Sequence, residues 1–339
     1  MARQFYVLML FGAFIAIMMS PVSARADPVI LAYFNVTETP LEDADLSRAL
    51  FEEQLNYIEL AGIRSRPVTE LQSGEEKSVT FTFENADRTN LDIIEYLIND
   101  KNHYVVVLIS TNKLTDDGFA QALKTLSRSE YMTLGIHGTS YKEWSFANEA
   151  EFRADLNRAL GTFRDVIGQE PEVFAFPYGL YTEEMKEEVL SRPFAAVLGQ
   201  ASGALAAHHE VWPRFTITEQ FGALERFETV LDSSGVELGD VTPRSSLITE
   251  TGPKMGFTLP EGLDPARLNC FLSGYGAFGG EIIGTHRIEL RPVLTPGQRS
   301  RVNCTIPIDE DRTGWIGFLI QADISDASNP APVLPESQE

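Results

Sequence analysis

The sequence predicts an α/β fold with a largely parallel sheet, followed by a small all-β module. From residue 28 to residue 198, apolar runs of strand length alternate with stretches of helical period, and this alternation implies right-handed βαβ units in a sheet that is open or closed into a barrel. Beyond about residue 232 the helical period ends, and short strand-like runs with turn residues follow, which is typical of a small sandwich.

Each predicted element has its own pattern. The central strand beginning at Ser78 alternates Val79, Phe81 and Phe83 with two threonines, which is the period of a strand. The predicted strands of the α/β part are Pro28–Asn35, Ser78–Phe83, Tyr104–Ser110, Tyr131–His137, Glu172–Phe176 and Phe194–Leu198. The predicted helices, which have apolar residues at intervals of three or four, are Glu42–Ala61, Leu91–Asn99, Asp117–Ser127, Glu149–Ile167 and Thr182–Leu190. The predicted strands of the module are Leu268–Leu272, Ile282–Leu290, Ser300–Ile306 and Trp315–Ile320.

The two ends of the chain carry separate signals. Arg3, an apolar stretch and an Ala-Arg-Ala site ending at Ala26 have the form of a cleaved secretory signal, although an uncleaved anchor remains an alternative. We therefore divide the chain into five parts and expect a periplasmic or secreted protein. The parts are a signal peptide (1–26), an α/β domain (27–232), a linker (233–260), an all-β module (261–323) and a disordered tail (324–339).

The net charge argues against certain partners, and the cysteines predict a disulfide. The formal net charge of −22 argues against nucleic acid or an anionic membrane surface as a partner, and no later run is long and apolar enough to span a bilayer. Cys270 and Cys304 are the two cysteines. In an exported protein they are expected to form one disulfide.

Oxygen-bearing side chains follow the central strand. Glu84, Asn85 and Asp87 come where this strand runs out, and α/β folds usually place their chemistry at that edge of the sheet. An ordinary Asn/Asp turn would give the same local pattern. Three later strand ends carry comparable residues, namely His137, Pro177-Tyr178 and Trp212-Pro213-Arg214. We expect the four strand ends to meet at one barrel mouth.

These stretches together resemble the polysaccharide deacetylase family, carbohydrate esterase family 4. The resemblance spans about Val29–Phe227 and rests on the ordered runs SVTFTFENAD, LGIHGTSY, FAFPYG, LGQASG and WPRF and on the helix Ala154–Ile167. It implies a distorted (β/α) barrel with fewer strands than the standard eight. It also implies metal-dependent hydrolysis of acetyl groups on sugar polymers, a reaction of carbon–nitrogen (non-peptide) bonds, with zinc as the expected divalent ion.

The chain departs from the family pattern at the implied metal site. Family members hold the metal with an Asp and two His, and a second Asp acts as base. Here Glu84 stands at the base position, Asn85 replaces the metal Asp, His137 is retained, and Tyr141 replaces the second His. Neutral amide and phenol oxygens bind zinc poorly. The remaining candidate ligands, whose spacing gives no support, are Asp87, His208 and His209.

The resemblance assigns roles to residues around this site. It implies that Arg214 orients the base and that the backbone N–H of Tyr178 is an oxyanion donor. Pro177, Tyr178 and Trp212 are the expected substrate-binding residues. Two functions follow: a metal-dependent deacetylase with an altered site, or a pseudoenzyme that binds an N-acetylated polysaccharide or a protein partner and needs no cofactor. A scaffold without sugar binding is the third alternative.

Overall fold

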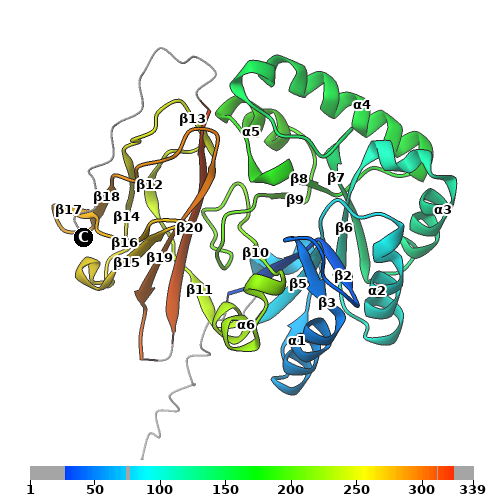
Figure 1. Ribbon diagram of the computed structural model, residues 1–339, viewed down its shortest axis with the longest axis horizontal. Helices are drawn as coiled ribbons and strands as arrows, with labels where there is room; N and C mark the ends of the chain where they lie inside the picture. Colours follow the sequence, from blue (N-terminus) through cyan, green and yellow to red (C-terminus); the bar gives the residue numbers. More distant parts are fainter. Residues whose placement is uncertain (1–26, 74–76, 311, 324–339) are drawn as a thin grey trace, which may run out of the picture.

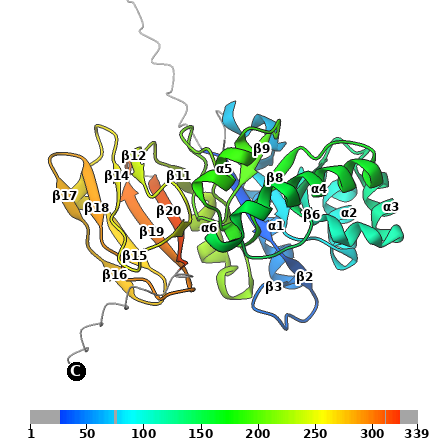
Figure 2. The ribbon, with the colours of Figure 1, turned by 90° about the horizontal axis from the view of Figure 1, so that it is seen from above.

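The computed structural model describes residues 27–73, 77–310 and 312–323, and it contains two bodies that lie side by side (Figures 1 and 2). The predicted signal peptide and disordered tail lie outside the described residues. The first body is a curled parallel sheet covered by helices on its outer side, and the second consists of β-strands (Figure 1). In the described part of the chain, no helix is long and apolar enough to cross a membrane.

The sheet of the first body is a distorted barrel, as predicted. Its strands are all parallel and follow the order β10-β1-β5-β6-β7-β8-β9, with β4 also pairing β5. The two ends of this order meet, because Trp212 pairs with Leu198 of β9 and Phe215 of β10 pairs with Leu31 of β1. The strands are β1 (Val29–Tyr33), β4 (Arg64–Ser65), β5 (Ser78–Phe83), β6 (Val105–Ser110), β7 (Met132–Gly138), β8 (Val173–Ala175), β9 (Ala196–Leu198) and β10 (Phe215–Thr216).

Helices surround the sheet (Figure 1). They are α1 (Arg48–Leu60), α2 (Leu91–Glu95) with a π-helical continuation (Tyr96–Asp100), α3 (Asp117–Leu126), α4 (Glu149–Ile167), α5 (Glu183–Leu190) and α6 (Leu224–Leu231). Short 3-10 helices occur at Val68–Ser73, Arg88–Asn90, Thr111–Thr115, Phe146–Asn148, Pro177–Gly179, Glu219–Phe221 and Pro265–Arg267. The predicted helix Glu149–Ile167 agrees with α4 at both ends.

The first helix begins later than predicted. Residues Asn35–Thr37 (β2) and Asp45–Ser47 (β3) form a small parallel pair, and α1 starts only at Arg48. The Asp45 carboxylate accepts hydrogen bonds from the backbone N–H groups of Leu41 and Glu42. These bonds hold the chain in a turn, and Ser47 then caps the helix.

Side-chain alternation along the strands separates the barrel interior from the helix-covered side. Phe81 and Phe83 belong to the cluster that packs against the helices, whereas Leu108, Ala175 and Leu198 belong to a second cluster inside the barrel. Thr80 and Thr82 have the opposite parity to the phenylalanines, and both are fully buried. The interior of the barrel at β5 is therefore lined by polar side chains.

The second body is a sandwich of two sheets, as predicted. A six-stranded sheet has the order β11-β20-β19-β15-β16 with β13 on β20, and a four-stranded sheet has the order β12-β14-β18-β17. Both sheets contribute to one core, in which the rings of Phe257 and Phe318 stack at 5.8 Å. The strands are β11 (Ser233–Gly235), β12 (Gly239–Thr242), β13 (Leu247–Ile248), β14 (Met255–Thr258), β15 (Asn269–Leu272), β16 (Gly276–Phe278), β17 (Glu281–Ile283), β18 (Arg287–Leu290), β19 (Arg299–Pro307) and β20 (Thr313–Ala322).

Residues 233–260, predicted to be a linker, instead form β11–β14. The strands β11 and β13 pair in parallel with β20, and β14 pairs with β18. The many Gly, Pro, Ser and Thr residues of this segment do not show a strand pattern. Its strands form by pairing with partners that lie far away in the sequence. The sandwich therefore begins immediately after α6.

The sandwich is packed tightly against the barrel through one face of β20. A Cβ atom on Gly317 would lie 1.8 Å from the carbonyl oxygen of Ser202, so only glycine permits this approach. The ring of Trp315 packs edge-on against Phe215 of the barrel, with centroids 5.1 Å apart. The β20 strand thus holds the segment that follows β9.

The predicted disulfide joins Cys270 of β15 to Cys304 of β19, which lie opposite each other in adjacent strands. The bond closes a chain segment with a sequence separation of 34 residues. Replacing both cysteines by alanine is expected to lower the free energy of unfolding by about 3–4 kcal/mol, because the unfolded chain gains conformational freedom. Urea unfolding of both proteins measures this. Equal stability would contradict the expectation.

Candidate functional site

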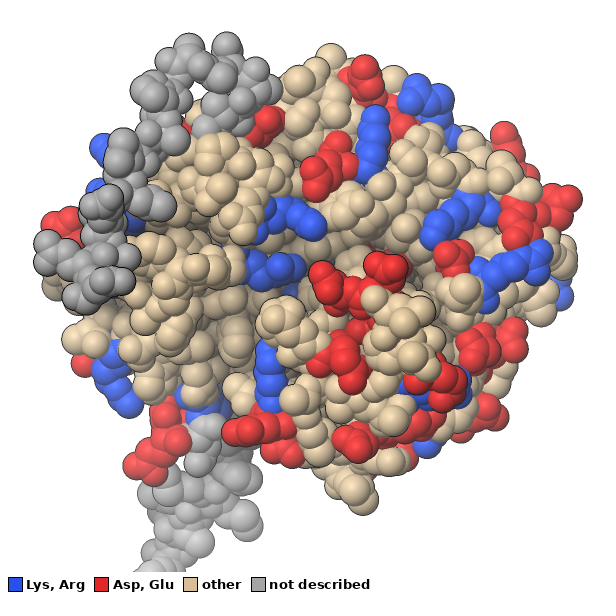
Figure 3. All heavy atoms as spheres, in the orientation of Figure 1, with Lys and Arg blue, Asp and Glu red and all other residues tan. Residues whose placement is uncertain are grey.

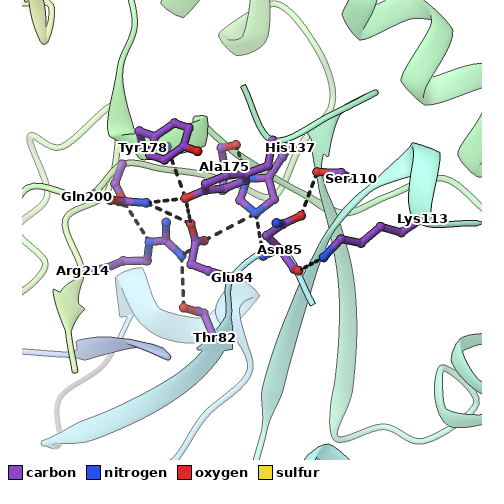
Figure 4. A network of polar contacts seen from close by, with 12 residues as sticks. Thr82, Glu84, Asn85, Ser110, Lys113, His137, Ala175, Tyr178, Gln200 and Arg214 are labelled. Carbon is purple, nitrogen blue, oxygen red and sulfur yellow. Dashed lines mark hydrogen bonds and ion pairs between the residues drawn. The ribbon is translucent and has the colours of Figure 1, made fainter. Parts of the chain in front are cut away.

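The candidate site lies inside the barrel, at the end where the strands finish, and it is built around Glu84. This residue follows β5 and has the same parity as Thr80 and Thr82, so its side chain points into the interior. Its carboxylate is fully buried. Arg214, which precedes β10 and is also fully buried, donates from Nη1 to Glu84 Oε1 at 2.6 Å (Figure 4).

The charge of Glu84 is compensated within the barrel. Burial alone would raise the pKa of this carboxyl, but the Arg214 guanidinium, His137 and hydrogen bonds from Arg214 and Tyr141 lower the pKa below its usual value. Arg214 is itself held in place, since Nε donates to the Gly199 carbonyl at 2.8 Å and Nη1 also donates to Thr82 at 3.1 Å. Glu84 and Arg214 therefore form an ionised pair with a fixed geometry.

Tyr141 and Gln200 complete the contacts of the carboxylate. The Tyr141 hydroxyl donates to Glu84 Oε2 at 3.0 Å, and Gln200 Nε2 donates to the same oxygen at 3.0 Å. Burial, followed by the negative charge of Glu84, raises the pKa of Tyr141 well above its usual value, so the phenol keeps its proton. Gln200 also donates to the Tyr141 oxygen at 2.9 Å. Both oxygens of Glu84 are thus occupied by partners from the chain.

His137 ends β7 and is fully buried beside the ion pair. Its Nδ1 lies 2.8 Å from the Ala175 carbonyl oxygen, which only accepts, so Nδ1 carries the proton. The backbone N–H of Asn85 donates to Nε2 at 3.2 Å. Burial lowers the pKa of His137, which favours the neutral ring. The lone pair with which this histidine could bind a metal is therefore used by the chain.

The side chain of Asn85, the residue predicted in place of the metal Asp, is bound to Ser110. The Ser110 hydroxyl donates to Asn85 Oδ1 at 3.0 Å, while the backbone adopts a φ of 47°. Nearby, the Lys113 ammonium donates to the Asn85 carbonyl (Figure 4), and it pairs with Asp87 at 3.2 Å. Lys113 therefore adds a positive charge next to the position where the resemblance implies a metal ion.

Tyr178 lies at the barrel mouth in the short helix Pro177–Gly179, with a φ of 57°. Its backbone N–H, the predicted oxyanion donor, donates to the Tyr141 hydroxyl at 3.3 Å. The two tyrosine rings lie 4.5 Å apart. One hydroxyl, that of Tyr141, thus donates once and accepts twice, which exhausts its hydrogen-bonding capacity.

The structure brings some predicted site residues together and places others elsewhere. Glu84, His137, Tyr141, Tyr178 and Arg214 form one connected network. Pro177 is buried. Trp212 is almost fully buried and lines a cavity of about 390 Å³ between barrel and sandwich.

The remaining candidate ligands lie outside the network. His208 lies 3.2 Å from Glu237, and His209 accepts from the backbone N–H of Ala206. Asp87 caps a short helix and pairs with Lys113.

Gln200 is a site residue that the sequence reasoning missed. It lies two residues beyond β9, with the same parity as Leu198, which points into the barrel. It also belongs to the run LGQASG on which the resemblance partly rests. This strand-end position is the signal that would have identified it.

Comparison with known proteins agrees with this geometry. Residues 72–197 match the model of the family described as polysaccharide deacetylase. The matched segment covers 126 of the 339 residues, and over this segment the chain is similar to the polysaccharide deacetylase family. No protein of curated function has a sequence that matches this chain significantly.

Solved structures of deacetylases share the fold. IcaB from Ammonifex degensii matches with 18% identity and a TM-score of 0.53, covering 61% of this chain and 97% of its own. The Streptococcus pyogenes deacetylase PplD, solved with acetate, matches with 15% identity and a TM-score of 0.54, covering 61% of this chain and 99% of its own. A de-N-acetylase from Aggregatibacter actinomycetemcomitans matches with 14% identity and a TM-score of 0.51, covering 59% and 99%. At these identities the similarity shows a common fold.

The residues at the family's metal position do not fit a catalytic zinc ion. Such an ion usually takes three protein ligands. Here Asn85 and Tyr141 offer neutral oxygens bound to other residues, and His137 Nε2 accepts from the backbone. Among the described residues, no group of three or more His, Cys, Asp or Glu side chains could hold a metal.

The missing ligands can be restored by substitution. The double variant Asn85→Asp, Tyr141→His regains one carboxylate and two imidazoles, which is a zinc-binding set, and it is expected to retain one zinc ion through dialysis. The natural chain is expected to lose zinc under the same conditions, and metal analysis of the dialysed proteins measures both. Adding His137→Ala to the double variant is the control and should abolish retention. Stoichiometric zinc in the natural chain would contradict the expectation.

The Glu84–Arg214 pair can be tested by a double-mutant cycle. Arg214→Met leaves the buried carboxylate without its counter-ion and is expected to lower the free energy of unfolding by about 3–5 kcal/mol. Combining it with Glu84→Gln removes the unpaired charge and should recover part of that loss. Urea unfolding of the four proteins gives the coupling energy. Purely additive losses would show that the pair makes no specific contribution.

Proposed function

We propose that this protein is an exported pseudoenzyme that binds an N-acetylated polysaccharide at the barrel mouth without hydrolysing it. The observation that carries the proposal is the saturation of the catalytic positions by the chain itself. Glu84, at the base position, is held by Arg214, Tyr141 and Gln200, and the predicted oxyanion donor of Tyr178 is bound to Tyr141. A base and a donor that are both already hydrogen-bonded to the Tyr141 hydroxyl offer little to a reacting amide.

Polysaccharide as the ligand class is supported by the family. The chain carries a polysaccharide deacetylase domain between residues 72 and 197. At the mouth, the ring of Tyr178 is half-buried, and aromatic rings cover the apolar faces of sugars well. A deacetylase barrel that lost its metal ligands while keeping the shape of its mouth would retain binding and lose turnover.

Export is supported by the disulfide and by the signal pattern of the first 26 residues. A bond between Cys270 and Cys304 persists in an oxidising compartment and is rare in reducing ones. We place the mature protein in the periplasm or outside the cell. The polymer that it binds would then belong to the cell envelope or to a secreted matrix.

Binding and turnover can be separated in one set of measurements. The mature chain from Asp27 is expected to bind N-acetylglucosamine oligomers in calorimetry, yet to release no acetate with added zinc, cobalt or nickel. Tyr178→Asn removes the ring while tolerating the left-handed backbone, and it should weaken binding about fivefold, which corresponds to about 1 kcal/mol.

Glu84→Ala serves as the control for the acetate measurement. Metal-dependent acetate that disappears in this variant would establish a deacetylase and contradict the proposal. Absence of both binding and acetate release would leave the barrel without a saccharide function.

A further inference from the structure

Three arginines gather where the sandwich meets the barrel mouth. Arg299 and Arg301 lie two residues apart on β19 and point to the same side of that strand, while Val302 and Cys304 point into the sandwich core. Arg226 comes from the first turn of α6. Figure 3 shows Lys and Arg side chains along this boundary, on a face that elsewhere carries many acidic groups.

The arginine cluster is connected to the candidate site through Tyr178. The Arg299 guanidinium lies 4.7 Å from the centre of the Tyr178 ring, an arrangement in which the cation is attracted by the face of the ring. The Tyr178 ring in turn contacts the ring of Tyr141, whose hydroxyl donates to Glu84. A sugar chain laid over Tyr178 would therefore also meet Arg299.

The three guanidinium groups lack acidic partners among the described residues. Arg226 donates to the Phe221 carbonyl at 2.6 Å and lies over the Phe221 ring. The described residues contain no carboxylate within 4.0 Å of the Arg226, Arg299 or Arg301 guanidinium groups. Other arginines of the chain are paired, such as Arg153 with Glu188 and Arg312 with Asp309.

Repulsion between the three guanidinium groups destabilises this arrangement when no anion is bound. Burial, and then the positive charges of Arg299 and Arg226, lower the pKa of Arg301, so the three groups repel one another. The chain has 49 acidic and 27 basic residues, so an acidic partner would have been readily available. An anion bound between the guanidinium groups would remove the repulsion and use their free donors.

We propose that Arg226, Arg299 and Arg301 bind carboxylates of an acidic polysaccharide, so that the N-acetylated polymer held at the mouth also contains uronic acid units. This inference rests on the polysaccharide binding proposed above and specifies its ligand. Arginine suits the task because its planar donors match the two oxygens of a carboxylate. The net negative charge of the protein is not an obstacle, because salt screens charges beyond about 8 Å at physiological ionic strength.

The test compares oligosaccharides of equal length by calorimetry. Hyaluronan fragments alternate N-acetylglucosamine with glucuronate, whereas chitin fragments contain N-acetylglucosamine alone. The mature natural chain is expected to bind hyaluronan at least about tenfold more tightly than chitin, which is the size of a charge-assisted hydrogen bond. Added sodium chloride should reduce the hyaluronan affinity and leave the chitin affinity nearly unchanged.

Single substitutions test which arginines cause the preference for hyaluronan. Arg301→Gln should remove most of the preference for hyaluronan while leaving chitin binding and thermal unfolding close to those of the natural chain. Arg299→Gln should also remove most of the preference. Arg267→Gln is the matched control, because this exposed arginine of the same sandwich lies outside the cluster. An equal loss in the Arg267 and Arg301 variants would show a general charge effect and overturn the inference.

The remaining outcomes separate this inference from the proposed function. Equal binding of hyaluronan and chitin would overturn the acidic ligand and leave polysaccharide binding intact. Binding of neither would overturn both. Tighter binding of chondroitin sulfate fragments than of hyaluronan would assign the cluster to sulfate groups and overturn the assignment to carboxylate.

Discussion

The ion pair between Glu84 and Arg214 is the interaction on which the interior of the barrel depends. A buried carboxylate requires a counter-charge, and Arg214 supplies it at 2.6 Å from a position fixed by Gly199 and Thr82. Tyr141 and Gln200 then fill the second oxygen of the carboxylate. With its charge and its hydrogen bonds satisfied within the chain, Glu84 stabilises the interior of the barrel.

The groups around the pair are likewise bound to partners from the chain. His137 Nε2 accepts from the backbone of Asn85, the Asn85 side chain binds Ser110, and Tyr178 N–H binds Tyr141. Each contact gives a buried polar group a partner that a metal or a substrate would otherwise provide. The interior is thus a connected hydrogen-bond network, in which Nη2 of Arg214 is a buried atom that has no hydrogen-bond partner among the described residues.

Much of the fold could be predicted from the sequence, because many of its strands and helices have a local pattern of apolar residues. The alternation of Val79, Phe81 and Phe83 predicts a strand whose other face, ending at Glu84, points into the barrel. The helix over Glu149–Ile167 follows from its own period. Most of what failed depends on distant partners. The strands β11, β13 and β14 exist because β18 and β20 pair with them. The late start of α1 has a local cause, because Asp45 binds the backbone of Leu41 and Glu42 before the helix. Gln200 becomes a site residue only when β9 and β5 lie in one barrel.

The sandwich brings an arginine, Arg299, to the mouth of the barrel. Close packing of Gly317 against Ser202 fixes β20, and therefore its neighbour β19, relative to the end of the barrel. That placement carries Arg299 from the second domain onto the ring of Tyr178 in the first. The positions 178, 226 and 299 are too far apart in the sequence for spacing to relate them. The contact between Arg299 and Tyr178 is therefore a property of the docked pair of bodies, whereas the network around Glu84 is a property of the barrel.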